Sequence, residues 1–161
     1  MKFHSAHTAI VNPPSASPVI TQEQLWKALQ QKARDPLRFV PVIETCDVIK
    51  EDTGGLTRVV TFKPGTGPPG KITEVVVFAG QVKADFYMED IGTSISNIIS
   101  LGDGGDTDMY LTFTFTWNFP EIQEGSEEAT TKAKQLTEVS KNAAAHTVKQ
   151  VREMLKDKSL V

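Results

Sequence analysis

The chain has 161 residues, of which 39% are hydrophobic and 23% charged, and its formal net charge is −3. This composition excludes a largely disordered chain, and the slight acidic excess argues against nucleic acid as a partner, since nucleic-acid binding needs a basic face. A single core can grow to this size, so we expect one domain over residues 1–161.

A cytoplasmic protein is expected from the cysteine content and the absence of hydrophobic segments. The single cysteine, Cys46, has no internal disulfide partner and suits a reducing compartment. The first residues lack the apolar run of a signal peptide, and no apolar stretch approaches the roughly 20 residues that span a bilayer. We therefore expect no membrane span, and both a monomer and a homodimer remain open.

The N-terminal third predicts a strand followed by helix. A strand over 3–12 ends at Pro13-Pro14, because proline has no N–H to donate to a sheet. Thr21 to Gln24 has the spacing of a capping box, so a helix begins at Thr21. Asp35-Pro36 ends that helix, and 36–41 can hold only a short turn of helix or an extended corner. The buried stripe of the first helix comprises Leu25, Leu29 and Ala33.

From residue 42 the hydrophobic period changes to two. Six strands are predicted, at 42–51, 56–63, 71–80, 83–89, 93–101 and 108–118. The last strand alternates most clearly, with apolar residues on one face and threonines on the other. Such a strand is typical of an antiparallel sheet that is covered on one side.

A long C-terminal helix is predicted from Ser126, its N-cap, to Leu160. The middle of its inward stripe consists of small residues, namely Ser140, Ala143, Ala144 and Thr147. Small side chains facing a curved sheet predict an internal cavity, with close packing as the alternative. The fold class is therefore α+β, a curved seven-stranded antiparallel sheet wrapped around a long C-terminal helix, with two short helices after the first strand.

This order of elements is similar to that of the helix-grip superfamily (SRPBCC, START-like or Bet v 1-like), which includes the major birch-pollen allergen, START lipid-transfer domains and polyketide cyclases. More narrowly, the chain resembles the AtaL-like, DUF1857 branch. The segments that carry the resemblance are Leu25 to Leu29, Lys32 to Pro36, Phe39 to Pro41, Leu56 to Phe62 with Glu74, and Tyr110 to Phe115.

Some relatives lie in fungal natural-product clusters, so the resemblance implies work on a hydrophobic molecule of secondary metabolism. We expect no cofactor. One departure concerns the end of the chain. Where the family leads us to expect a glycine, this sequence has Asp157-Lys158-Ser159.

Strand parity places three charges on one predicted face. If 42–51, 56–63 and 71–80 pair as consecutive hairpins, Asp47, Arg58 and Glu74 share the mostly apolar, concave face. Buried charges must pair, so Arg58 is expected to be partly neutralised by Glu74 or Asp47 and to present its planar fork to a ligand carbonyl, enolate or carboxylate. The alternative is that Arg58 forms a purely structural ion pair. A one-residue slip in the strand register would move the three charges to the opposite face of the sheet.

Further candidates complete the predicted site. Asn97 lies on the apolar side of its strand, with a buried amide satisfied by backbone as the alternative. Cys46 is expected on the face opposite Arg58. The histidines have no metal-ligand spacing, so no metal is expected. Apolar lining is expected from Val60, Phe62, Phe113, Phe115, Trp117, Ala143 and Thr147, which as plain core residues would show the same pattern.

Three functions fit these features. The first is binding of a hydrophobic metabolite or polyketide-like intermediate in an internal cavity. The second is a cofactor-independent cyclase, isomerase or dehydratase in that cavity, with Arg58 polarising a carbonyl while Glu74 or Asp47 moves a proton. The third is an interaction module, which predicts a filled core. For the first two, Arg58→Ala is expected to abolish binding or turnover with little loss of fold.

Overall fold

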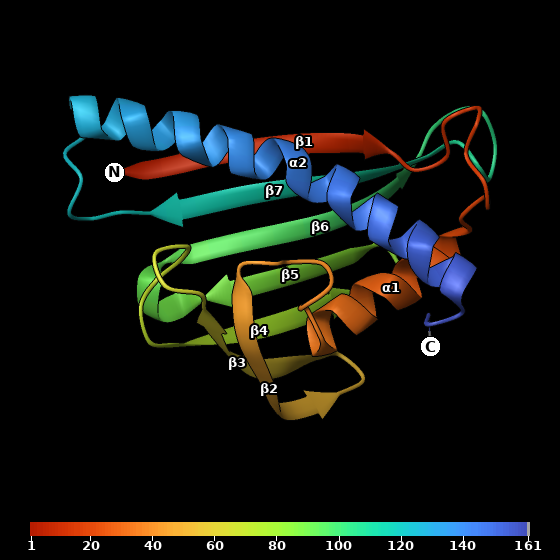
Figure 1. The fold of residues 1–161 in the computed structure, drawn as a ribbon, viewed down its shortest axis with the longest axis horizontal. Helices are drawn as coiled ribbons and strands as arrows, with labels where there is room; N and C mark the ends of the chain where they lie inside the picture. The colour runs from red at the N-terminus through yellow and green to blue at the C-terminus, as the bar shows by residue number, and fades with distance from the viewer. Residues whose placement is uncertain (161) are drawn as a thin grey trace.

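The computed structural model describes residues 1–160, in which both helices lie on one face of a single sheet (Figure 1). The strands pair throughout as antiparallel neighbours in the order β1-β7-β6-β5-β4-β3-β2. The elements are β1 (Lys2–Ile10), α1 (Gln22–Arg34), β2 (Ile43–Asp52), β3 (Gly55–Phe62), β4 (Lys71–Ala79), β5 (Lys83–Met88), the 3-10 turn η1 (Glu89–Ile91), β6 (Thr93–Leu101), β7 (Met109–Asn118) and α2 (Glu127–Asp157). This is the predicted helix-grip architecture.

The inner face of the sheet is the one that the helices cover. On β7 it carries buried Met109, Leu111, Phe113 and Phe115, whereas Thr112, Thr114 and Thr116 lie on the outer face. The alternation predicted from the sequence therefore holds along this strand. It places an aromatic wall beneath α2.

Helix α1 begins as its capping box predicts, because Thr21 Oγ1 accepts from the Gln24 backbone and the Gln24 side chain accepts from the Thr21 backbone. The short turn of helix that was one alternative for 36–41 is present, but it is not a second helix, so the predicted count of two short helices is wrong. That segment holds a single turn, in which the Val40 N–H donates to Pro36 O at 2.8 Å. Too few residues separate Pro36 from the start of β2 for a longer helix to propagate.

The small residues of α2 divide between two surroundings. Ser140 and Ala144 are buried, and Ser140 Oγ lies 2.7 Å from Ser5 Oγ of β1, so this side packs closely. Ala143 and Thr147 instead border a pocket. Close packing and an open space, which were alternatives in the sequence, therefore both occur on this helix.

Strand β2 departs from the predicted register. Two β-bulges, between Ile43 and Thr45 and between Val48 and Lys50, each add one residue against β3. Between the two bulges, the β2 residues that were predicted to face inward face outward, and the reverse. One extra residue is enough to reverse the in–out alternation of side chains along a strand. Asp47 is therefore exposed on the outer side, and the prediction that it joins Arg58 and Glu74 is wrong.

Helix α2 ends where a glycine was expected. Lys158 is its C-cap, with φ 58° and ψ 29°, a left-handed conformation that costs a residue with a Cβ about 1 to 2 kcal/mol. Lys158→Gly is expected to raise the free energy of unfolding by about 1 kcal/mol in urea denaturation. Lys156→Gly, in the last helical turn, is expected to lower it by about 1 kcal/mol. Equal losses of stability in Lys158→Gly and Lys156→Gly would show that the Lys158 cap is not strained.

No helix within residues 1–160 has both the length and the apolar character that crossing a bilayer requires.

Candidate functional site

A buried ion pair joins β3 and β4 on the inner face of the sheet. Arg58 of β3 and Glu74 of β4 are directly opposite in the register, and they are 3% and 1% exposed. Arg58 Nε donates to Glu74 Oε2 at 2.5 Å, and Nη2 of the same guanidinium also contacts that carboxylate. β3 and β4 pair without a bulge, so the predicted parity holds here.

Arg58 also holds the end of α1. Its Nη1 donates to the backbone oxygens of Lys32 at 3.0 Å and Ala33 at 2.8 Å. These carbonyls belong to the last helical turn, whose acceptors have no intrahelical partner. The guanidinium thus joins β3, β4 and α1, and each of its three nitrogens contacts a protein oxygen.

Lys32 of α1 is a second buried cation in this region, with only 6% of its surface exposed. Its Nζ donates to Asn97 Oδ1 of β6 at 2.6 Å. The amine also lies over two aromatic rings, 4.2 Å from the Phe113 centroid and 5.4 Å from that of Phe86. Among residues 1–160, no carboxylate is within salt-bridge distance of it.

Burial sets the protonation behaviour of Lys32. Removal from water, reinforced by the nearby Arg58 charge and opposed by Glu74, lowers the pKa of the Lys32 amine to about 7. An exposed lysine titrates near pH 10.4, so this amine changes charge in a range where a general acid or base operates.

Two neighbouring pockets share Lys32 and Val40 as lining residues. The larger has a volume of about 270 Å³ and lies between the aromatic wall of β7, the middle of α2 and the 36–42 segment. The smaller, of about 80 Å³, is bordered by Arg58, Glu74, Phe62 and Phe86. The larger volume is near the lower end of the range usual for ligand pockets.

The larger pocket opens to solvent between α2 and the segment that follows α1. Its rim includes the exposed residues Val42 and Val139. Beside the rim, His146 Nε2 lies 3.3 Å from the Arg38 backbone oxygen, and the Arg38 side chain pairs with Asp157 at 3.0 Å. These contacts fasten the 36–42 segment to α2.

Two polar atoms near Lys32 have no hydrogen-bond partner within residues 1–160. They are the Oγ1 of Thr147, a residue that lines the larger pocket, and the Nδ2 of Asn97, whose amide oxygen accepts from Lys32. Leaving such a group buried and unpaired costs about 1 to 3 kcal/mol. Both residues are almost fully buried, at 1% and 0% exposure. The site therefore has unused hydrogen-bonding capacity beside an apolar space.

The remaining predicted site residues are distributed as follows. Phe113, Phe115, Ala143 and Thr147 line the larger pocket, and Phe62 lines the smaller. Val60 is fully buried in the core next to the smaller pocket, without lining it. Trp117 stacks on Phe115, with ring centroids 4.6 Å apart, beyond the lining of either pocket.

Sequence reasoning missed two residues of the site, Lys32 and Phe86, and misplaced Cys46, which lies outside the pocket lining. Lys32 lies seven residues after Leu25 and so on the buried stripe of α1, which was the available signal. Phe86 of β5 lies under both cations, with Arg58 Cζ 5.2 Å from its ring centroid. Cys46 was expected on the opposite face, but the bulge turns it inward, and burial raises the pKa of its thiol.

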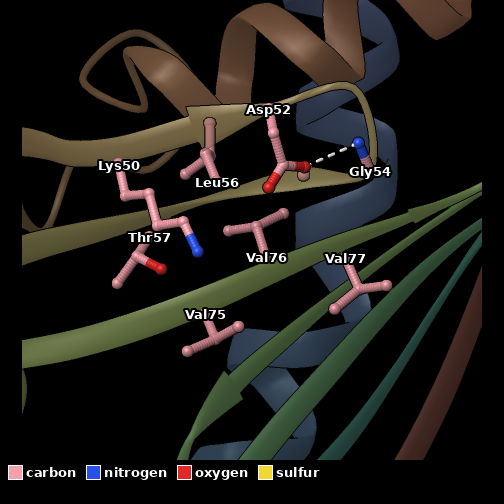
Figure 2. A pocket seen from close by; sticks show the side chains of 9 residues that line it. Lys50, Asp52, Gly54, Leu56, Thr57, Val75, Val76 and Val77 are labelled. Atoms are coloured by element: carbon pink, nitrogen blue, oxygen red, sulfur yellow. Dashed lines mark hydrogen bonds between the residues drawn. The ribbon is translucent and has the colours of Figure 1, made fainter.

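A separate groove of about 220 Å³ lies at the β2–β3 hairpin, lined by residues that include Lys50, Asp52 and Val77 (Figure 2). The hairpin is closed by the Gly54 N–H, which donates to Asp52 Oδ1 at 2.8 Å. The groove contains no aromatic residue and no buried charge. It therefore lacks the features that make the Lys32 region suited to binding.

No group of three or more potential metal ligands occurs among the described residues, counting His, Cys, Asp and Glu. The side chains that line the two pockets include the Lys32 amine, the Thr147 hydroxyl, the His146 imidazole and the buried Arg58–Glu74 pair.

Comparisons with known proteins agree with this architecture. The family model of the acetylaranotin biosynthesis cluster protein L, AtaL, matches residues 5–158. The protein of that name from Aspergillus terreus is 19% identical over 150 residues, which cover 93% of this chain and 88% of that protein.

Solved structures with the same fold include three of low sequence identity. The di-domain ARO/CYC StfQ from the steffimycin biosynthetic pathway has a TM-score of 0.68 at 10% identity, over 99% of this chain and 53% of that one. The KanY protein has a TM-score of 0.65 at 13% identity, over 94% and 98% of the two chains. Ara h 8.0201 has a TM-score of 0.55 at 14% identity, over 94% and 97%.

Proposed function

The chain belongs to the AtaL family, and from this premise we propose that it binds a hydrophobic small molecule of secondary metabolism in the pocket that contains Lys32. The molecule carries an oxygen function that accepts a hydrogen bond from the Lys32 amine. The observation that carries the proposal is a buried amine without a carboxylate partner beside an aromatic-lined space. Ligand pockets usually combine such a space with a few convergent polar groups.

The unpaired polar atoms support the same proposal. A ligand oxygen near Lys32 and Thr147 would supply the hydrogen bond that Thr147 Oγ1 lacks. The binding role first predicted for Arg58 passes to Lys32, because the Arg58 donors are engaged by Glu74 and by the α1 carbonyls. In this proposal Arg58 and Glu74 position the end of α1, and with it the Lys32 backbone. The open pocket is less compatible with an interaction module, which needs a filled core.

Catalysis in the same pocket is a second candidate, a cofactor-independent cyclisation, isomerisation or dehydration. It is favoured by the Lys32 pKa of about 7, which allows one amine to accept and return a proton near neutrality. The resemblance of the fold to that of the ARO/CYC StfQ is compatible with this role.

Native mass spectrometry of protein purified from its own host tests the proposal. We expect a co-purifying apolar, oxygen-containing molecule in a one-to-one complex. A molecule whose mass and chromatographic retention both stay unchanged after incubation supports binding alone, and a change in either supports catalysis, because isomerisation alters retention but not mass. Protein that stays unliganded when mixed with the host's own hydrophobic extract would contradict both roles.

Filling the pocket from α2 is expected to block binding. Ala143 is half-buried in the pocket lining, so Ala143→Phe places a ring in the ligand volume and should weaken binding at least about tenfold. Ala145 is exposed two residues further along the helix, and Ala145→Phe serves as the matched control with unchanged affinity. Titration of the ligand by calorimetry measures both. Equal affinities in the two variants would place the binding site elsewhere.

A further inference from the structure

We propose that Lys32 is a nucleophilic amine that forms an imine with a ligand bearing an aldehyde or ketone group. The inference rests on the proposed function, because it assigns a carbonyl class to the ligand of the same pocket. It also goes beyond that function, since it adds a covalent bond between the ligand and Lys32.

The geometry leaves the nitrogen free to react. A neutral amine has two hydrogens and one lone pair, and Lys32 Nζ uses a hydrogen in its bond to Asn97 Oδ1. That bond orients the amine and leaves the lone pair available. Lys32 lines both pockets, and its amine lies over the ring of Phe113, which lines the larger, and over that of Phe86, which lines the smaller, so a carbonyl group in either pocket would lie close to it.

The surrounding charges favour the neutral amine. The charged groups that act on Lys32 are Arg58 of β3, which opposes protonation, and Glu74 of β4, which favours it. Glu74 is bound to Arg58, so its charge is largely compensated. A lysine that is desolvated beside another cation is a known arrangement for an activated amine nucleophile. The pKa of about 7 agrees with this arrangement.

The reaction balances without a co-reactant. The Lys32 lone pair attacks the carbonyl carbon and forms a C–N bond, and a proton moves from nitrogen to oxygen to give a carbinolamine. The C–O bond then breaks, and the oxygen leaves as water with the second proton from nitrogen. Thr147 Oγ1, an unpaired hydroxyl in the same pocket, is suited to hydrogen bond the oxygen during these steps.

Reductive trapping tests the proposal. The native protein is incubated at pH 7 with 2-octanone and sodium cyanoborohydride, which reduces an imine to a stable secondary amine. Peptide mapping by mass spectrometry then locates the adduct. We expect labelling at Lys32 at least about tenfold faster than at Lys27, an exposed lysine of the same helix that pairs with Glu23 at 3.2 Å. An excess of 2-octanol, which lacks the carbonyl, should slow labelling at Lys32 and leave Lys27 unaffected.

The possible results of this experiment distinguish the imine proposal from the binding proposal. If 2-octanol or 2-octanone binds in the pocket but Lys32 is labelled no faster than Lys27, the imine is wrong and the binding function remains. If neither compound binds and no adduct forms, the binding function fails for this class of ligand and the imine fails with it. Lys32→Met is expected to lose the labelling. If that variant folds poorly, the peptide map of the labelled wild-type protein decides the outcome.

Discussion

Arg58→Ala is expected to lower the free energy of unfolding by about 3 to 5 kcal/mol, because it leaves the buried Glu74 carboxylate without a cation. It also removes the donor to two carbonyl oxygens at the end of α1. The sequence had suggested little loss of fold from this change. That expectation assumed a guanidinium free to reach a ligand, whereas its donors are committed to protein atoms.

Urea denaturation followed by circular dichroism measures the loss, with Arg34→Ala as the matched control. Arg34 forms an exposed pair with Glu51 at 2.6 Å, and such pairs contribute about 0 to 1 kcal/mol. Replacing both buried charges, as in Arg58→Met with Glu74→Leu, should restore much of the stability. A cost for Arg58→Ala no larger than that for Arg34→Ala would contradict the structural role of the buried pair.

Lys32→Met is expected to change how stability depends on pH. The pKa of Lys32 is lowered from 10.5 to about 7 in the folded protein, so between these values the unfolded chain binds a proton that the folded chain does not. The free energy of unfolding of the wild type therefore rises with pH through this window, and the Lys32 contribution to that rise is absent from the variant. The full difference across the window is on the order of 5 kcal/mol.

Denaturation of both proteins at several pH values from 6.5 upward measures this difference, since all other titrations are shared and cancel. Lys27→Met, which removes an exposed amine of the same helix, should follow the wild-type profile. Parallel profiles for wild type and Lys32→Met would show that the Lys32 amine titrates as an exposed lysine does, and would remove the basis for an activated amine.

The sequence predicted the faces of the sheet well wherever strands pair without interruption. Arg58 and Glu74 could be placed on one face from parity alone, because no bulge separates their strands. Asp47 and Cys46 could not, because β2 is an edge strand in which two bulges reverse the alternation. A bulge arises from backbone geometry and leaves little trace in a polar–apolar pattern.

The centre of the site was less predictable for another reason. Lys32 has the helical spacing of a buried residue, but charged side chains are so seldom fully buried that the pattern favours exposure. Its partner Asn97 was identified from an apolar strand face, without any indication of what it binds. Contacts between α1 and β6 depend on how the helix crosses the sheet, and periodicity within one element carries no information on that crossing.

The crystal structure of the protein with its co-purified ligand tests the central claim most directly. We expect the molecule between the aromatic wall of β7 and α2, with an oxygen within hydrogen-bond distance of Lys32 Nζ or with a covalent bond to that atom. A ligand in the groove of the β2–β3 hairpin, with the Lys32 pocket empty, would contradict the claim.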